Sequence, residues 1–163
     1  MIENYKKPKK TLVIYRLGPV EAQNQFIEYI EESAKGYVIY HLTNNCLKDQ
    51  NTILQYLDSN EFGSVMYAII GDLCLDFNFT LRIKKNYKVT LIACHFDIQE
   101  YFDNFFVYMA QLFDLLLLDE QSELQRYKNY GFNASWFNHG YPERYRVDPE
   151  TNRDIDVAFV GRM

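Results

Sequence analysis

A pair of residues spaced for acid–base chemistry, His95 and Asp97, stands in the segment Cys94-His-Phe-Asp97. The pair follows an apolar run, Lys88 to Ala93, of the kind that forms a buried strand. At the end of a strand, two side chains separated by one residue can point into one cleft. There the imidazole can bond an acceptor hydroxyl and the carboxylate can take its proton. The alternative, which we favour, is that Asp97 caps a helix beginning near Ile98 while His95 bonds to backbone.

Two other strand ends carry residues suited to ligand binding. Gly18 lets a ligand approach the N-terminus of the first predicted helix, where backbone amides favour anions. A plain Gly18-Pro19 turn is the favoured alternative, because the segment lacks a Gly-x-Gly-x-x-Gly fingerprint. Asp72, beside Gly71, suits a metal ion or a phosphoryl group, as a receiver aspartate does, although an aspartate in a turn is the commoner case.

A third candidate region lies near the end of the last predicted strand. Trp136, the only tryptophan, offers a flat face that complements the apolar surface of a sugar ring, or it packs the turn between two domains. His139 opens the turn His139-Gly140-Tyr-Pro142, in which glycine is free to take positive φ and proline fixes its own φ. Together with Gly18 and Asp72, Trp136 and His139 are therefore candidate ligand-binding residues.

The chain has no P-loop, no nucleophile elbow and no clustered metal-ligand motif. Cys46, Cys74 and Cys94 are odd in number and lack the close spacing of metal ligands. We expect three reduced, partly buried thiols rather than a disulfide framework or a zinc site. The sequence therefore predicts neither a bound metal nor a cofactor.

Strand-like and helix-like segments alternate along the chain and must position these residues. The predicted extended segments are Thr11–Tyr15, Tyr37–Leu42, Ser64–Ile70, Lys88–Ala93, Leu115–Leu118 and Phe132–Phe137. Four predicted helices contain Ala22–Ile30, Phe77–Lys85, Tyr101–Phe113 and Gln121–Tyr130. A fifth is capped by Asn44 or Asn45 and ends before Asn60–Gly63. A strand in the last half of Phe77–Lys85 remains an alternative. The series predicts an α/β, Rossmann-like, doubly wound parallel sheet.

Composition and charge narrow the functional classes. A net charge of -5 argues against a nucleic-acid binder, which needs positive charge to neutralise phosphates. The cluster Lys6-Lys7-Pro8-Lys9-Lys10 suits peripheral contact with an anionic membrane or partner, but a solvated leader is favoured. No run has the roughly 20 apolar residues of a membrane span. The opening Met-Ile-Glu-Asn begins no apolar signal region, so we expect a cytoplasmic protein.

The end of the chain divides into a turn, a polar connector and a short strand. Residues 1–142 form the predicted Rossmann-like domain, and residues 143–154 have the composition of a solvated linker. Ile155 to Val160 is mostly apolar and runs into Gly161, which is typical of a buried parallel strand. We expect residues 155–163 to be the first strand of a second domain whose remainder lies beyond this chain.

Two segments, Tyr127-Lys-Asn-Tyr-Gly131-Phe-Asn-Ala-Ser-Trp-Phe-Asn-His-Gly140-Tyr-Pro and Arg153-Asp-Ile-Asp-Val-Ala-Phe-Val-Gly161, carry a family resemblance. They resemble the domain junction of glycosyltransferases related to the spore maturation protein CgeB. That junction has a helix ending in Tyr-x-x-x-Gly, a strand leading to a glycine-containing turn, and an Asp-Ile-x-Phe-Val-Gly-like strand. The likeness covers about the last 37 residues and is architectural before them.

This resemblance implies the N-terminal half of a GT-B fold, in which two Rossmann-like domains face a cleft. The first domain chiefly takes the acceptor, which is a glycan, a protein or a small molecule, and the second takes the nucleotide-sugar donor. The resemblance therefore implies that the candidate ligand-binding residues bind the acceptor: Gly18, Asp72, Trp136 and His139. Gly161 and Arg162 then match the start of the donor-side loop, where Arg162 would face diphosphate. GT-B enzymes generally need no bound metal. The nucleotide sugar is their substrate, so the resemblance implies no cofactor.

Two hypotheses follow. The first is the acceptor-side domain of a glycosyltransferase, inactive alone, with Asp97 as catalytic base if the enzyme inverts and His95 beside it. The second is a noncatalytic Rossmann-like or receiver-like module whose acidic strand ends bind a metal or a partner. The gene sequence beyond Met163 distinguishes them, because only the first hypothesis requires a second βα series there.

Overall fold

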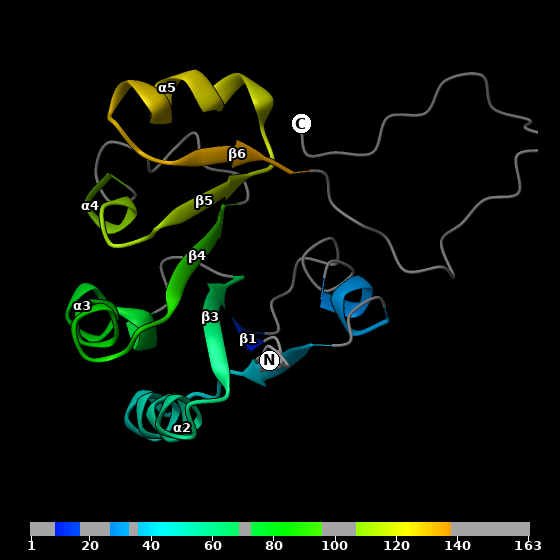
Figure 1. The fold of residues 1–163 in the computed structure, drawn as a ribbon, viewed down its shortest axis with the longest axis vertical. Helices are drawn as coiled ribbons and strands as arrows, with labels where there is room; N and C mark the ends of the chain where they lie inside the picture. Colours follow the sequence, from blue (N-terminus) through cyan, green and yellow to red (C-terminus); the bar gives the residue numbers. More distant parts are fainter. Residues whose placement is uncertain (1–8, 17–26, 33–35, 69–72, 96–106, 138–163) are drawn as a thin grey trace, which may run out of the picture.

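Six parallel strands form one sheet in the order β2-β1-β3-β4-β5-β6 (Figure 1). The computed structural model describes residues 9–16, 27–32, 36–68, 73–95 and 107–137. The strands are β1 (Lys10–Tyr15), β2 (Tyr37–His41), β3 (Phe62–Tyr67), β4 (Thr90–His95), β5 (Leu115–Leu118) and β6 (Ala134–Trp136).

Helical segments connect these strands. They are residues 27–32, α2 (Cys46–Asp58), the 3-10 turn η1 (Leu73–Leu75), α3 (Phe77–Asn86), α4 (Val107–Ala110), the 3-10 turn η3 (Gln121–Glu123) and α5 (Leu124–Asn129). The prediction of an α/β, Rossmann-like sheet with parallel strands and interleaved helices is confirmed.

The direction of winding reverses at the centre of the sheet. The chain places β2 on one side of β1 and then crosses back to place β3 on the other side. This arrangement puts a topological switch point between β1 and β3, as in the flavodoxin-like order 2-1-3-4-5. In such sheets ligands bind outside the carboxyl ends of the strands. The edge that carries these ends is therefore the place to look for a site.

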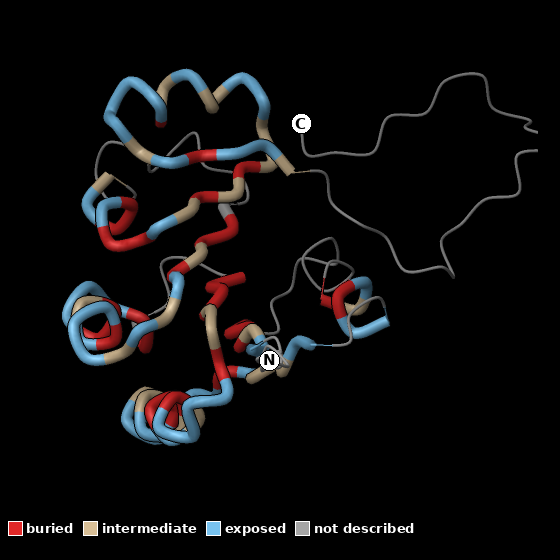
Figure 2. Tube along the Cα trace, in the orientation of Figure 1, coloured by how far each residue is buried: buried red, intermediate tan, exposed pale blue. Residues whose placement is uncertain are grey.

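Both faces of the sheet are buried, which explains the continuous apolar runs. Leu12 and Ile14 of β1 belong to a core shared with α2, α3, α4 and α5, whereas Val13 and Tyr15 pack with the helical residues 27–32. Figure 1 shows α2, α3 and α4 on one side of the strands, residues 27–32 on the other, and α5 beside β6. Buried positions follow the strands and the inner sides of the helices in Figure 2. Parallel strands covered in this way lack one-sided alternation.

The cap of α2 settles one alternative and moves one boundary. Asn45 is the N-cap, because its side-chain oxygen accepts a hydrogen bond of 3.1 Å from the backbone N–H of Lys48. The predicted breaker Gly63 instead lies inside β3, which begins at Phe62. A Cβ on Gly63 would lie 2.9 Å from the Cβ of Lys9. Glycine is thus required there by the close approach of Lys9, the residue that precedes β1.

The alternative strand within Phe77–Lys85 is wrong, because α3 continues to Asn86. Asp76 caps this helix by accepting a 2.8 Å hydrogen bond from the backbone N–H of Phe79. Phe79 and Ile83 are buried one turn apart, at the helical period. A capping aspartate and an i, i+4 apolar pair therefore determine the conformation.

The second half of the sheet follows the prediction with shifted ends. In the described part of the helix predicted at Tyr101–Phe113, α4 ends at Ala110. Phe113 then packs against Tyr67, with ring centroids 5.3 Å apart. The chain leaves α5 through Gly131, whose φ is +84°, and enters β6. The predicted linker at 143–154 and the predicted strand at 155–163 lie outside the described residues.

Candidate functional site

Because all six strands are parallel, their carboxyl ends meet at one edge of the sheet. His95 is the last residue of β4, and its backbone lies beside Leu118 of β5. The prediction that His95 ends a strand at this edge is therefore confirmed for the backbone. The other predicted residues of this edge and of the donor side lie outside the described residues: Gly18, Asp72, Asp97, His139, Gly161 and Arg162.

Trp136 lies at this edge as the last residue of β6. Its indole N–H donates a 3.1 Å hydrogen bond to the backbone carbonyl of Asp119, which follows β5. The side chain is nevertheless 45% exposed. The hydrogen bond holds the ring in one orientation while much of its surface meets solvent. The geometry is that of a fixed aromatic platform, as stacking on a flat ligand requires.

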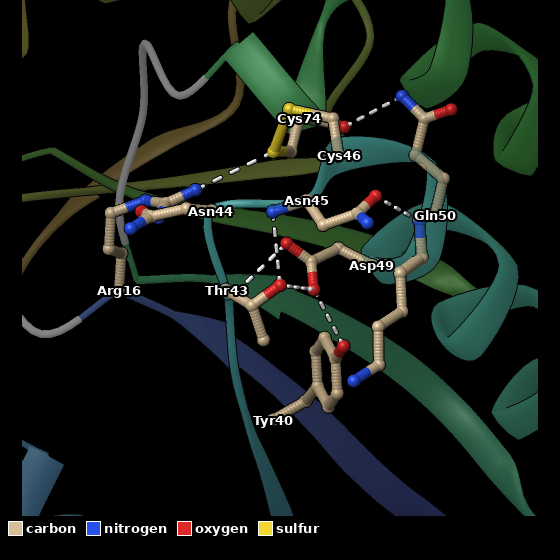
Figure 3. Close-up of a disulfide and its surroundings, with 10 residues drawn as sticks. Arg16, Tyr40, Thr43, Asn44, Asn45, Cys46, Asp49, Gln50 and Cys74 are labelled. Carbon is tan, nitrogen blue, oxygen red and sulfur yellow. Dashed lines mark hydrogen bonds between the residues drawn. A yellow bond between two sulfur atoms is a disulfide. The ribbon is translucent and has the colours of Figure 1, made fainter.

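A second group of polar residues lies at the carboxyl ends of β1 and β2. Arg16, directly after β1, donates from Nη1 to the Oδ1 of Asn44 at 3.1 Å and from Nη2 to the Sγ of Cys74 at 3.5 Å (Figure 3). Asn44 comes from the β2–α2 connection and Cys74 from η1 after β3. Arg16 thus joins the connections that follow the two neighbours of β1, at the switch point.

Cys46 and Cys74 form a disulfide (Figure 3), so the expectation of three reduced thiols is wrong for these two residues. Their separation of 28 residues gave no motif. They meet because the start of α2 follows β2 and η1 follows β3, so both segments lie at the carboxyl edge of the parallel sheet. Their Cα atoms are 4.6 Å apart, within the usual range for a disulfide.

The remaining cysteine behaves as expected. Cys94 is a buried free thiol in the core that packs with residues 27–32. Burial raises the pKa of this thiol to about 12. Cys94 therefore stays protonated and serves as a small apolar residue, as predicted.

Beside the disulfide, a buried carboxylate fixes the β2–α2 connection. Asp49, in the first turn of α2, has no exposed surface. It accepts hydrogen bonds from the backbone N–H of Thr43 at 2.9 Å, from the Thr43 hydroxyl at 2.8 Å and from the Tyr40 hydroxyl at 2.9 Å (Figure 3). Burial, followed by this bond to Asp49, raises the pKa of Tyr40, so its hydroxyl remains a donor. Thr43 and Asn44 are thereby held over the end of β2.

The opposite end of the disulfide is also held. Gln50 of α2 donates from Nε2 to the backbone carbonyl of Cys74 at 2.9 Å (Figure 3). The η1 segment is therefore joined to α2 by one covalent bond and one hydrogen bond. Sequence reasoning considered Asn44 as a possible helix cap and missed the contacts of Arg16 with Asn44 and Cys74.

Metal-ligating side chains do not gather within the described ranges, where no group of three His, Cys, Asp or Glu residues is placed to hold an ion. Among those same residues, none of the helices combines the length and the apolar character needed to cross a bilayer. Of the predicted basic cluster, Lys10 pairs with Glu61 at 2.8 Å, and both side chains are substantially exposed.

The fold and this edge define a doubly wound α/β domain with a polar switch point. Comparison of the chain with protein-family models, with curated proteins and with solved structures gave no significant match in any of the three.

Proposed function

We propose that this chain is the acceptor-side domain of a GT-B-type glycosyltransferase related to the CgeB group, which transfers a sugar from a nucleotide-sugar donor to an acceptor. The parallel, doubly wound sheet supports this proposal, because such a sheet presents ligands at the carboxyl edge. The resemblance of residues 127–142 and 153–161 to the domain junction of that group supports it further.

The observation that carries the proposal is Trp136. Sugar rings bind to aromatic faces through their apolar C–H surface, and a ring that is already oriented loses little entropy on binding. Trp136 is oriented by its hydrogen bond to the Asp119 carbonyl and stays 45% exposed at the carboxyl edge. In the alternative, Trp136 packs the turn between two domains. That role predicts no binding of sugars to the ring.

In this proposal the acceptor lies along the carboxyl edge between β4 and β6. Asp97, two residues after the end of β4, is the proposed base that takes the proton of the acceptor hydroxyl, with His95 beside it. Gly18, Asp72 and His139 complete the acceptor side, and Gly161 and Arg162 begin the donor side. The nucleotide sugar is a substrate, and the enzyme is active only with its second domain.

The test of acceptor binding uses the only tryptophan as its own reporter. Indole fluorescence, excited at wavelengths that tyrosine does not absorb, is followed while the chain is titrated with neutral gluco-, galacto- and N-acetylglucosamine oligosaccharides. We expect a saturable change with at least one series. Calorimetry should then show binding retained by Trp136→Phe and lost by Trp136→Ala. Unchanged fluorescence with every series, or equal affinity of both variants, contradicts the role of Trp136.

The test of catalysis uses the longer protein. Thermal-shift measurements against UDP-, GDP- and TDP-sugars identify the donor, and transfer is then compared between the wild type and Asp97→Asn. We expect Asp97→Asn to fold normally and to lose most of its turnover. Near-normal transfer by the variant would remove Asp97 from the mechanism without affecting the acceptor assignment.

A second candidate function is a noncatalytic receiver-like module, and the strand order favours it specifically, because 2-1-3-4-5 is the order of such folds. Metal-assisted transfer of a phosphoryl group to an aspartate needs several oxygen ligands for the metal ion. The end of β1 instead carries Arg16, whose guanidinium is positively charged and offers no oxygen. Titration with Mg²⁺ and acetyl phosphate separates the candidates. Covalent phosphorylation that Asp72→Asn abolishes would establish the module and overturn the transferase proposal.

A further inference from the structure

We propose that the Cys46–Cys74 disulfide is a thiol–disulfide exchange site, opened by a thiol reductant such as glutathione, rather than an inert structural crosslink. The proposal does not depend on the transferase assignment. It rests on the different exposure of the two cysteine residues and on the groups that stabilise each sulfur as a thiolate.

Cys46 is the sulfur that an incoming thiolate can reach. It is partly exposed, whereas Cys74 is only 1% exposed. Cys46 is also the first residue of α2, directly after the N-cap Asn45. A cysteine at a helix N-terminus has a lowered thiol pKa, because the free backbone N–H groups and the helix dipole favour the anion. Cys46 therefore combines access with a stabilised reduced form.

Cys74 is the better leaving group. The guanidinium of Arg16 donates to its Sγ at 3.5 Å, and this contact already exists in the disulfide form. When the S–S bond breaks, the positive charge lies beside the sulfur that receives the electron pair. A nearby cation lowers the pKa of a thiol, and a leaving thiol of lower pKa departs faster. Figure 3 shows Arg16 extended toward the disulfide from the end of β1.

The exchange balances in two steps. A glutathione thiolate attacks the Sγ of Cys46, the Cys46–Cys74 bond breaks, and Cys74 leaves as a thiolate beside Arg16. A second glutathione thiolate attacks the glutathione sulfur of the mixed disulfide, forms oxidised glutathione and releases Cys46 as a thiolate. Two glutathione molecules are oxidised and one protein disulfide is reduced, with protons exchanged with water according to each thiol pKa.

Opening the bond changes the carboxyl edge of the sheet. The disulfide ties the start of α2 to η1, so it crosslinks the connections that follow β2 and β3. After reduction, noncovalent contacts still join these connections, among them the Gln50 bond to the Cys74 carbonyl and the bonds of Arg16 to Asn44 and Cys74. The switch point between β1 and β3 therefore has a covalently closed state and an open state.

The main experiment counts thiols and requires no variant of the pair. The oxidised chain is equilibrated with glutathione buffers of increasing reduced fraction, quenched with a maleimide under denaturing conditions and weighed by mass spectrometry. We expect one reactive thiol, Cys94, in oxidising buffer and three in buffers with the reduced fraction of the cytosol. A pair that is opened only by dithiothreitol, or three thiols even in oxidising buffer, overturns the proposal.

Arg16 variants test the leaving group, and they are made in a Cys94→Ala background so that only the pair reacts. Arg16→Gln removes the charge, and we expect the equilibrium constant for reduction to fall about tenfold, equivalent to about 30 mV. Arg16→Lys keeps a cation and should restore most of this loss. Equal constants for the parent and Arg16→Gln would overturn the assigned role of Arg16.

Single-cysteine variants test the point of attack. In the Cys94→Ala background, Cys74→Ser leaves only Cys46, which we expect to form a mixed disulfide with oxidised glutathione at least about tenfold faster than the Cys74 thiol left by Cys46→Ser. If the Cys46→Ser variant reacts as fast or faster, the assigned direction of exchange is wrong. Circular dichroism of both variants confirms that the sheet is folded before the rates are compared.

Discussion

Replacing the buried carboxylate of Asp49 should destabilise the whole domain, because this side chain holds the connection between β2 and α2. Asp49 is fully buried and accepts three hydrogen bonds, two from Thr43 and one from Tyr40. In Asp49→Ala these donors lose their charged acceptor. Hydrogen bonds to charged groups contribute about 1.5–3 kcal/mol each when buried.

The expected magnitude lies below the sum of three such bonds. Thr43 is exposed and Tyr40 is half-buried, so water can replace part of the interaction on the donor side. The loss of the carboxylate should therefore lower the free energy of unfolding by about 3 kcal/mol. For a chain of this length, that loss corresponds to a fall in Tm of roughly 6–12 °C.

The assay is urea unfolding followed by circular dichroism, with Asp58→Ala as the matched control. Asp58 is the last residue of the same helix, is exposed and accepts one hydrogen bond from Tyr87. A carboxylate at a helix C-terminus opposes the helix dipole, so its removal should change stability by less than about 0.5 kcal/mol. If Asp49→Ala is as stable as Asp58→Ala, the hydrogen-bond network does not hold this connection.

Two further predictions concern the core and the last turn. Burial raises the pKa of Cys94 from an ordinary 9.0 to about 12, so above pH 9 the unfolded chain loses a proton that the folded chain retains. Stability should fall between about pH 9 and pH 12, by up to about 4 kcal/mol from this group, and Cys94→Ala should remove that part of the pH dependence in denaturant titrations. Gly131 has φ of +84° with open space around its missing Cβ, so Gly131→Ala should cost about 1 kcal/mol and Gly131→Asn less, because asparagine tolerates this region better. Equal thermal stability of those two variants would contradict a purely backbone cost.

The pattern of the sequence was enough to predict the sheet, because its strands are buried on both faces and its helices have apolar stripes. The run Leu115–Leu118 was predicted with its observed bounds, and Ile53, Leu54 and Leu57 form the expected buried stripe of α2. Boundaries moved where a single contact decided them. The start of β3 is one such case, since Gly63 lies inside the strand, where Lys9 leaves no room for a Cβ.

The polar junction at the switch point depended on long-range geometry and could not be predicted in this way. Cys46 and Cys74 are brought together because both follow parallel strands at the carboxyl edge of the sheet, and nothing in their local sequence shows this. Arg16 marks the end of β1, but its two partners come from connections 28 and 58 residues further along the chain. The order of the strands had to be known before these partners could be assigned.

The central position of β1 has a consequence for synthesis of the chain. β1 is made before both of its neighbours, and its Thr11 pairs with Ser64 of β3 across 53 residues. A ribosome therefore releases this central strand long before the segment that completes its hydrogen bonds. Until β3 emerges, the nascent chain exposes the edge of β1 that pairs with β3, with its backbone hydrogen-bonding groups unpaired. Such an intermediate is a natural client for a holding chaperone, and slow translation ahead of β3 would prolong its exposure to aggregation.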